Sequence, residues 1–437
     1  MRKRKLRIKK LWIFFFSVVL IVSIYFFLSQ KEEPLKVYKV NYISEILSYN
    51  REDLEKDFLI WVEKEYGTEV LKKINETLKE NSYTKQIWHN LTGNSYIVLN
   101  DMYSNNYKDR SDVTVIPEKK ESITIGYAGD VSLADNWSIM PKYKSRKKKV
   151  YGILSENIVN QMEAMDWMIV NSEFAFSKKG TPMKNKLYTF RADPENVNIY
   201  NEMSVDMVTL ANNHVYDYGK DAFLDTLSTL KNQKLPYIGA GKNSKEAESA
   251  HYLIINGYKI AFLSATRAEK YIMTPEAKES SPGVFRCYDP TRLSERIKEE
   301  KKNSDYVVAI VHWGTENSHK LETVQKETGR LYIDSGADMV IGHHAHVLQG
   351  FEYYKGKLIA YNLGNFIFNT LKVDTGILKW TLNKDGSSQF HFVPGLQKDC
   401  YTDILSSKAA KTLYNKLSDW SVNVLVDENG TLKENGK

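Results

Sequence analysis

The sequence predicts an α/β protein with a largely parallel central sheet. From Ser122 onward, short apolar runs of strand type alternate with longer segments in which apolar residues recur at helical spacing. Such alternation is typical of parallel sheets whose strands are joined by helices. Acidic, amide and imidazole side chains directly follow several of these strands. Because ligands of open α/β sheets bind beyond the carboxyl ends of the strands, the same pattern predicts where a functional site lies.

Length and composition are those of a globular protein, and the net charge has a local origin. A chain of 437 residues with 42% hydrophobic and 26% charged residues can bury a large core. The net charge is +7, but seven of the 61 Lys and Arg lie in the first ten residues, which leaves 54 basic against 54 acidic residues. The body of the protein is therefore neutral, and nucleic-acid binding has no support. Two cysteines imply no disulfide framework.

The N-terminus carries the pattern of a membrane anchor. Leu11–Leu28 contains no charged residue and as a helix would span about 27 Å, close to the roughly 30 Å of a bilayer core. The preceding basic cluster predicts a cytoplasmic N-terminus and an extracellular C-terminal domain. No small-residue cleavage site follows, so we expect an uncleaved anchor at residues 11–28 after a basic segment at residues 1–10. The predicted location is the cell membrane, in a single-pass topology.

Residues 29–120 predict a small helical stalk or linker region. Two sets of apolar residues recur at helical spacing and predict two amphipathic helices, one around Phe58 and one around Ile74. No chemistry is visible there. Ile116–Glu121 (IPEKKE) has the composition of a linker, so we expect the main domain at residues 121–395 and a C-terminal extension at residues 396–437.

The main domain is predicted to alternate strands with helices before it ends in antiparallel β structure. The predicted strands are Ile123–Ala128, Trp167–Val170, Met207–Leu210, Pro236–Ile238, Tyr252–Ile255, Lys259–Ser264, Tyr306–Val311, Asp338–Ile341 and Lys357–Tyr361. The predicted helices are Leu154–Met165, Glu195–Met203, Lys220–Lys231, Leu293–Lys302 and Glu322–Ser335. A final hairpin is expected from Gly376–Leu382 and Gln389–Val393.

Histidine clustering predicts a metal site. The chain has nine histidines, and five of them lie between His312 and His346. One predicted strand ends at His312, and another stops at Gly342 and delivers His343, His344 and His346 into a loop. Neutral imidazole is a common ligand for zinc, iron and similar ions, so a metal site is the first hypothesis for this segment.

Other predicted strand ends add oxygen donors to these imidazoles. The combined set of carboxylate, amide and imidazole groups suits one or two divalent ions of the manganese, zinc or iron type. Calcium would require more oxygens, and structural zinc usually takes thiolates. The members of the set are Asp130, Glu173, Asn213, His214, His312, His344 and His346.

Eight motifs in a fixed order carry a family resemblance. They are GYAGDVSLAD around Asp130, NSE at 171–173, FRADP at 190–194, ANNHVYDYG at 211–219, GAG at 239–241, VHWGTE at 311–316, GADMVIGHHAHVLQG at 336–350 and YNLGNFIF at 361–368. From Ile123 to Phe368 the chain resembles the CapA-type poly-γ-glutamate capsule proteins. That resemblance implies a four-layer α/β/β/α sandwich of the calcineurin-like metallophosphoesterase type and a role in making, anchoring or exporting poly-γ-glutamate.

The resemblance also implies roles for individual residues. His214 corresponds to an acid that protonates a leaving oxygen, and His343 lies outside the H-x-H pair of ligands. Metallophosphoesterases usually open with Asp-x-His, whereas Ser132 stands two residues after Asp130, so one metal position lacks a ligand. The implied ligands are Asp130, Glu173, Asn213, His312, His344 and His346.

Further candidates lie near the predicted strand ends. A cationic rim would suit a polyanion, and both Arg191 and the run Lys142–Lys149 (KYKSRKKK) are candidates, although such a run also fits a solvated loop. Glu316 lies four residues after His312 and is a candidate catalytic base or a group that orients a ligand; an ordinary surface carboxylate is the alternative. Asn365 follows Gly364 and fits either a turn or a ligand contact.

Three functional hypotheses follow. The first is a membrane-anchored, metal-dependent hydrolase or transferase of poly-γ-glutamate synthesis, working with other capsule synthase subunits. The second is a component that binds or exports the polymer without turning it over, which the serine at position 132 favours. The third is a metal-dependent phosphodiesterase unrelated to capsule.

Overall fold

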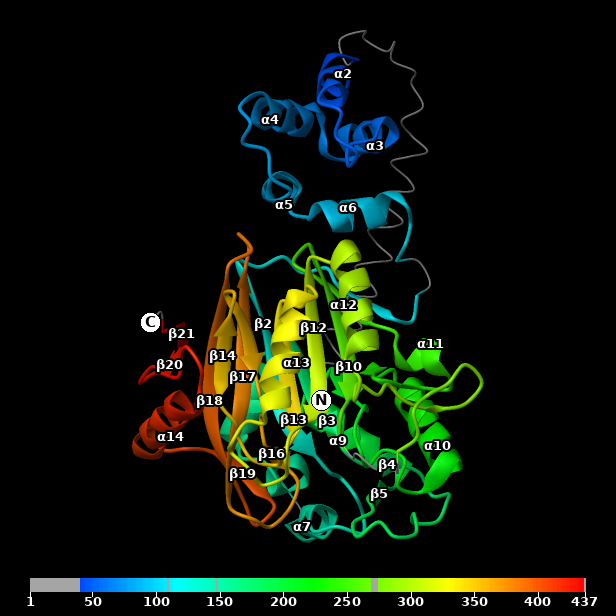
Figure 1. Ribbon diagram of the computed structural model, residues 1–437, viewed down its shortest axis with the longest axis vertical. Helices are drawn as coiled ribbons and strands as arrows, with labels where there is room; N and C mark the ends of the chain where they lie inside the picture. The colour runs from blue at the N-terminus through cyan, green and yellow to red at the C-terminus, as the bar shows by residue number, and fades with distance from the viewer. Residues whose placement is uncertain (1–39, 108–109, 147, 269–273, 436–437) are drawn as a thin grey trace. The chain divides into compact units, whose positions relative to one another are not determined.

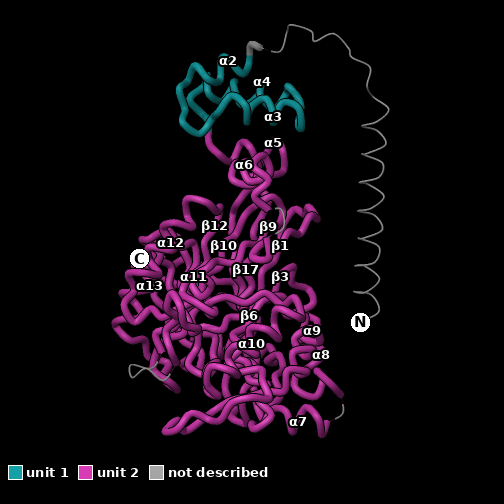
Figure 2. Tube along the Cα trace, turned by 90° about the vertical axis from the view of Figure 1, so that its right-hand side faces the viewer, with its two compact units in different colours: residues 1–83 teal, residues 84–437 magenta. Residues whose placement is uncertain are grey.

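The computed structural model describes residues 40–107, 110–146, 148–268 and 274–435 (Figure 1). The chain divides into two compact units, Met1–Tyr83 and Thr84–Lys437 (Figure 2). The predicted membrane span Leu11–Leu28 lies outside the described residues. Among the residues that are described, no helix has the length and apolar character needed to cross a bilayer.

The first unit is helical. It contains α2 (Val40–Ser48), α3 (Lys56–Tyr66) and α4 (Thr68–Lys79), and each buries an apolar stripe. The helices predicted around Phe58 and Ile74 are therefore confirmed as α3 and α4.

The second unit begins earlier than the sequence predicted. Helices α5 (Gln86–Thr92) and α6 (Tyr96–Tyr103) belong to this unit rather than to the first. The hydroxyl of Ser95, the N-cap residue of α6, donates a 2.7 Å hydrogen bond to Asp305, and Nε2 of His89 lies 2.9 Å from the carbonyl of Asn256. These contacts join residues before the predicted boundary near residue 120 to the sheet-containing part of the chain.

Two large sheets form the second unit. A seven-stranded sheet has the order β1-β9-β10-β12-β13-β15-β14, and an eight-stranded sheet has the order β19-β18-β17-β2-β3-β6-β7, with β16 paired to β2. In the first sheet β10, β12, β13 and β15 run parallel, as do β2, β3, β6 and β7 in the second. The predicted parallel order is thus present in both sheets, while antiparallel strands flank each parallel block.

The strand bounds follow the predicted apolar runs closely. The seven-stranded sheet contains β1 (Val113–Ile116), β9 (His251–Ile255), β10 (Tyr258–Thr266), β12 (Tyr306–Trp313), β13 (Met339–His344), β14 (Phe351–Tyr354) and β15 (Lys357–Ala360). The eight-stranded sheet contains β2 (Ser122–Val131), β3 (Trp167–Ser172), β6 (Met207–Thr209), β7 (Tyr237–Ile238), β16 (Asn365–Ile367), β17 (Val373–Asn383), β18 (Ser388–Lys398) and β19 (Tyr401–Ile404). Three short pairs complete the strands: β4 (Ala175–Phe176) with β5 (Arg191–Ala192), β8 (Ala240–Gly241) with β11 (Gly283–Val284), and β20 (Val424–Val426) with β21 (Leu432–Glu434).

The sheets pack face to face between two layers of helices (Figure 1). Buried side chains from both sheets, such as Ile125 and Ile310, share one core. Helices α12 (Thr291–Asn303) and α13 (Thr323–Asp334) bury their apolar faces on the seven-stranded sheet. The outer face of the other sheet is covered by α7 (Ile139–Arg146), α8 (Glu156–Glu163), α9 (Asn198–Glu202) and α10 (Gly219–Asn232). Short helical segments occur at η2 (Lys149–Gly152), η3 (Pro194–Val197) and α11 (Ser244–Ala247).

The C-terminal residues are part of this unit. Strand β18 runs across residue 395, where the sequence placed a boundary, and continues to Lys398. Helix α14 (Ser407–Trp420) buries Leu413 and Leu417 in the core shared by the two sheets. The residues after 395 therefore contribute to the hydrophobic core, as far along the chain as Leu432 of β21.

Candidate metal centre

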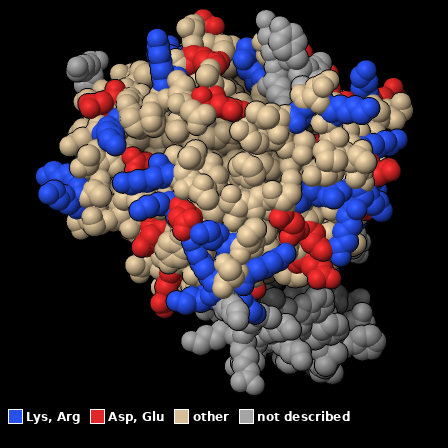
Figure 3. Space-filling model, turned by 90° about the horizontal axis from the view of Figure 1, so that it is seen from below, with Lys and Arg blue, Asp and Glu red and all other residues tan. Residues whose placement is uncertain are grey.

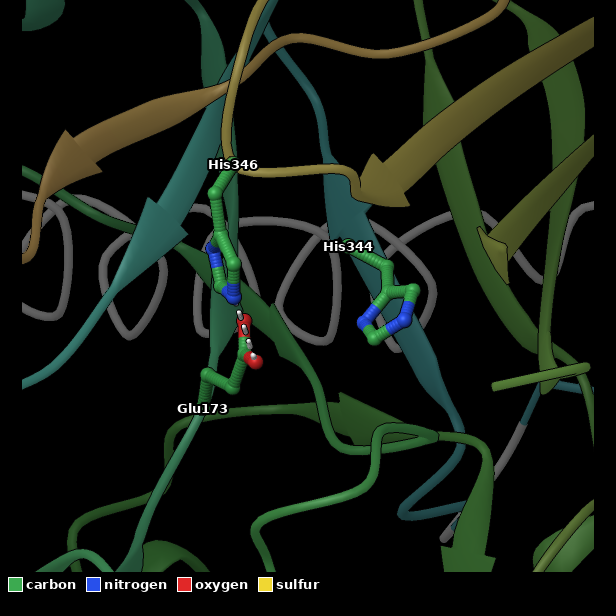
Figure 4. A group of neighbouring side chains, drawn as sticks. All are labelled: Glu173, His344 and His346. Carbon is green, nitrogen blue, oxygen red and sulfur yellow. Dashed lines mark ion pairs between the residues drawn. The ribbon is translucent and has the colours of Figure 1, made fainter. Parts of the chain in front are cut away.

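Two parallel strands of the seven-stranded sheet deliver the histidines. His312 of β12 is the register partner of His343 of β13, so both side chains leave the same face of the sheet. His344 would alternate to the other face, but its φ of 93° and the φ of 58° at His346 turn the chain at the strand end. As a result His344 and His346 both approach the eight-stranded sheet, where Glu173 lies (Figure 4).

The eight-stranded sheet contributes the carboxylates. Asp130 lies near the carboxyl end of β2, and Glu173 follows β3 directly. Both side chains are fully buried. A Cβ atom on Gly129 would lie 1.8 Å from the carbonyl oxygen of Gly364, so only glycine allows this approach of the chain next to Asp130.

The ligand atoms converge into two overlapping groups. Side-chain donors of Asp130, Glu173 and His312 lie within 4.8 Å of one another, and so do those of Glu173, His344 and His346. Oε1 of Glu173 is the shared point, since it lies 3.7 Å from Nε2 of His312 and 3.8 Å from Nε2 of His346. In Figure 4, the side chains of Glu173 and His346 point toward one another, His346 from the loop after β13. Side chains that the sequence predicted at separate strand ends thus lie together, with Asn213 beside His312.

Two of these donor atoms are buried without a hydrogen bond. Oε1 of Glu173 and Nδ1 of His344 form no hydrogen bond with any described residue. Burial and the nearby Asp130 carboxylate raise the pKa of Glu173 well above its usual range, and burial lowers the pKa of His344 to about 3 and that of His312 well below its ordinary value. Buried, unpaired oxygen and nitrogen donors are costly unless a cation completes them, so the donor set fits a divalent ion.

His346 and Asp130 form the charged part of the cluster. Although burial lowers the pKa of His346, the Glu173 and Asp130 carboxylates raise it to about 10. Burial opposes ionisation of Asp130, but His343 and His346 hold its pKa well below the usual range. Nδ1 of His343 lies 3.3 Å from Oδ1 of Asp130, so this histidine, which the H-x-H pattern leaves out, also contacts the cluster.

Asn171 connects the carboxylates, a role that the sequence did not reveal. Its amide nitrogen donates to Oδ1 of Asp130 at 2.8 Å and to Oε2 of Glu173 at 3.1 Å. Its oxygen accepts hydrogen bonds from Thr209 and Asn212. The residue appears in the NSE motif at the end of β3, but only the structure shows that its amide spans two candidate ligands.

The loop after β6 supplies an amide and an imidazole. Oδ1 of Asn213 lies 2.8 Å from Nε2 of His312. Nδ1 of His214 lies 2.7 Å from Oδ2 of Asp217, and Nε2 of His214 lies 4.0 Å from Oε1 of Glu173. Burial lowers the pKa of His214, while Asp217 opposes that effect. Asp217 therefore fixes the orientation of a largely neutral ring whose other nitrogen faces the cluster.

A buried lysine completes this loop. Nζ of Lys186 lies 2.8 Å from Oδ1 of Asp217 and also donates to the carbonyl of Asn213. Neither Lys186 nor Asp217 was singled out from sequence, because the partners lie in different motifs and no spacing links them.

The other predicted residues occupy varied positions. Glu316 is exposed and forms no hydrogen bond or ion pair with another described residue, although its charge contributes to the raised pKa of Glu173 and His346. Ser132 is buried with its hydroxyl unpaired among the described residues. Asn365 pairs with Asp130 in β-sheet register, and its Oδ1 lies 2.8 Å from Nδ1 of His346.

Basic residues of the run after β2 form ion pairs with acidic side chains. Lys142 and Arg146 of α7 pair with Asp399, and Lys144 pairs with Asp135. These contacts bind the run to the protein surface. Arg191 lies elsewhere, with its guanidinium carbon 4.1 Å from the ring centre of Tyr218.

Comparison with known proteins identifies the family. The sequence model of the bacterial capsule synthesis protein PGA_cap matches residues 124–370, the part that holds every candidate ligand. The chain belongs to the PGA_cap family. The resemblance to CapA-type proteins is therefore confirmed.

Two PGA_cap relatives illustrate the extent of the similarity. The chain is 32% identical over 248 residues to the capsule biosynthesis protein CapA of Bacillus anthracis, covering 55% of this chain and 60% of that protein. It is 34% identical over 236 residues to the PGA biosynthesis protein CapA of Bacillus subtilis, covering 53% and 61%. The matched part thus spans about 60% of the length of these relatives. Among solved structures, NAD nucleotidase of Haemophilus influenzae is 12% identical, with a TM-score of 0.37 and coverage of 72% of this chain and 60% of that one.

Proposed function

We propose that this PGA_cap protein is a membrane-anchored, extracytoplasmic protein of poly-γ-glutamate capsule synthesis with a divalent-metal site of the metallophosphoesterase type. The observation that carries the proposal is Oε1 of Glu173, which is buried without a hydrogen bond and lies within 4.0 Å of the imidazoles of His214, His312 and His346. The family and the CapA relatives support the capsule assignment. The anchor is assigned to Leu11–Leu28 on the basis of its sequence.

The proposed ligands are Asp130, Glu173, Asn213, His312, His344 and His346. A mixed set of carboxylate, amide and imidazole donors favours manganese, zinc or iron over calcium. One or two such ions would supply a Lewis acid that polarises a carbonyl or phosphoryl group and activates water at neutral pH.

The chain's own groups would handle the proton and the orientation of the reacting bond. Asp217 fixes the His214 ring through Nδ1, so Nε2 is directed toward the cluster. The neutral ring must first take up a proton at Nε2, and the resulting imidazolium is the proposed donor to the leaving atom. Asn171 holds the two carboxylates in a fixed relation. Glu316 is retained as a proposed base that would have to approach the cluster from the exposed loop after β12.

Metal content and thermal stability of the purified full-length chain test the site. We expect bound divalent ion by elemental analysis and a melting temperature that rises with added Mn²⁺ or Zn²⁺. Asp130→Ala and His344→Ala should abolish both effects, whereas His391→Ala, outside the cluster, should leave them unchanged. If the wild-type chain binds no divalent ion, the proposed metal site is wrong.

A second candidate function is that of a subunit that binds the polymer without cleaving it. The observation that favours it is Ser132, whose buried hydroxyl stands where metallophosphoesterases usually provide an imidazole. Metal-loaded protein that retains polymer but cleaves neither γ-glutamyl oligomers nor phosphodiesters would support this function. Cleavage of phosphodiesters alone would instead support a phosphodiesterase unrelated to capsule.

A further inference from the structure

A small pocket lies beside the candidate metal centre and is separate from it. Its volume is about 210 Å³. Two pairs of consecutive residues link the pocket to the centre. Asp217, which orients His214, is followed by Tyr218 of the pocket. Phe190, whose ring centre lies 4.5 Å from that of His214, is followed by Arg191 of the pocket. Its lining residues are Asp135, Asn136, Ser177, Lys178, Arg191, Ala192, Asp193 and Tyr218.

The two carboxylates of the pocket are already neutralised. Asp135 pairs with Lys144 at 3.0 Å and accepts the backbone N–H of Asp193 at 2.6 Å. Asp193 pairs with Lys178 at 2.9 Å and accepts the backbone N–H of Glu195. Neither acid therefore presents an uncompensated charge to a ligand.

Arg191 is the exception among the charged groups of the pocket. Its Nη1 donates to the carbonyls of Lys179 and Gly180 at 2.8 and 3.1 Å, and the guanidinium lies over the Tyr218 ring. Within the described part of the chain it has no carboxylate partner, and its Nε and Nη2 atoms donate to no other residue. A guanidinium held in place by peptide carbonyls and an aromatic face, with one edge uncommitted, is arranged to bind a carboxylate.

The overall charge of the surrounding surface does not account for the binding of a carboxylate chain. Seen from the end at which α7 lies, basic and acidic side chains are interspersed rather than gathered into a patch of one sign (Figure 3). Recognition of an anionic chain on such a surface has to come from individual built contacts rather than from a general field.

We propose that the Arg191 pocket is a subsite that binds the α-carboxylate of one glutamyl unit of a γ-linked chain while another part of the same chain lies at the metal centre. This inference rests on the proposed function for its substrate class. In γ-linked glutamate the peptide bond uses the side-chain carboxyl, so each unit retains a free α-carboxylate beside the backbone. The uncommitted edge of the Arg191 guanidinium can therefore bind the α-carboxylate of one such unit.

Binding of fluorescent γ-linked oligoglutamate to the full-length chain tests the subsite. We expect Arg191→Gln to weaken binding by about 10- to 100-fold and Arg191→Lys to weaken it less. Lys178→Gln leaves the Arg191 contacts intact but frees the Asp193 charge, so it should also weaken binding. Lys326→Gln on α13 removes an equal charge far from the pocket in the layer order and should have no effect.

The outcomes separate this inference from the proposed function. Arg191-dependent binding that persists in His344→Ala supports the subsite even where no turnover is found. Metal-dependent turnover with an unchanged KM in Arg191→Gln and Lys178→Gln overturns the subsite and leaves the function standing. Equal binding of α-linked oligoglutamate or tripolyphosphate overturns the assignment of a γ-linked carboxylate chain. Melting curves of each variant identify any loss of binding that arises from unfolding. If Arg191→Gln does not fold, the binding measured for Lys178→Gln decides between the two outcomes.

Discussion

The side-chain amide of Asn171 donates a 2.8 Å hydrogen bond to Asp130, and both residues are buried at the carboxyl ends of adjacent parallel strands. The same nitrogen reaches Glu173, so one neutral side chain sets the spacing of two carboxylates that would otherwise repel each other. The candidate centre thus depends on a residue that is not itself a proposed ligand.

Replacing Asn171 by Ala should lower divalent-metal affinity by about 10- to 100-fold, because the two carboxylates lose the group that orients them. Isothermal titration with Mn²⁺ or Zn²⁺ measures the effect. Asn160→Ala, on the exposed side of α8, is the matched control and should bind metal as wild type does. Unchanged affinity in Asn171→Ala would show that the carboxylates are held by other contacts.

Replacing His214 by Gln should lower kcat by about 10²- to 10⁴-fold on any substrate that the wild type cleaves, because the proposed proton donor is lost. Metal content should stay close to that of wild type, since His214 is not a proposed ligand. Asp217→Asn should also reduce kcat, because it alters the group that orients the ring. A variant with full activity would remove His214 from the mechanism.

Gly129→Ala should destabilise the fold and the centre together. The added Cβ would lie 1.8 Å from the Gly364 carbonyl, and relief of that overlap moves β2 away from β16 next to Asp130. We expect a loss of about 3 kcal/mol in urea unfolding together with weaker metal binding. Gly395→Ala, where the nearest atom is 3.3 Å from the added Cβ, is the control and should be tolerated far better.

His251 should make stability depend on pH. Burial lowers its pKa to about 4, whereas the unfolded chain takes up the proton near 6.5. The stabilisation is therefore complete above about pH 6.5 and is lost as pH falls toward 4, by up to about 3 kcal/mol in total. Urea unfolding from pH 4 to 7 should show a shallower dependence in His251→Gln than in wild type. The same slope in both proteins would contradict the assignment, and His391→Gln should retain the wild-type slope.

Much of the fold was predictable because apolar runs and helical spacing report burial directly. The strands β2, β3, β12 and β13 were predicted within a few residues, and the polar side chains at their ends do converge. Periodicity does not show which strands pair, so one central sheet was expected from the residues alone where two stacked sheets occur. Only the family resemblance suggested the layered arrangement.

Details of the site could not be predicted from the sequence, for a different reason. The contacts of Asn171, Lys186 and Asp217 join motifs that are distant in sequence, and no local spacing records them. The left-handed backbone at His344 is likewise not evident from a strand-like run. The extent of the second unit was also hidden, because α5 and α6 attach to it through scattered polar contacts such as Ser95 to Asp305.

The pairing of β2 with β17 affects how the chain can fold as it is synthesised. Ile123 pairs with Leu382, so β2 cannot gain this neighbour in the eight-stranded sheet until the chain has emerged as far as β17. Until then β2 has an unpaired edge and exposed apolar residues, which are features that promote aggregation and slow folding. The protein should therefore acquire its metal-binding geometry only late in biogenesis, and a ribosome-stalled chain ending before β17 should remain dependent on chaperones.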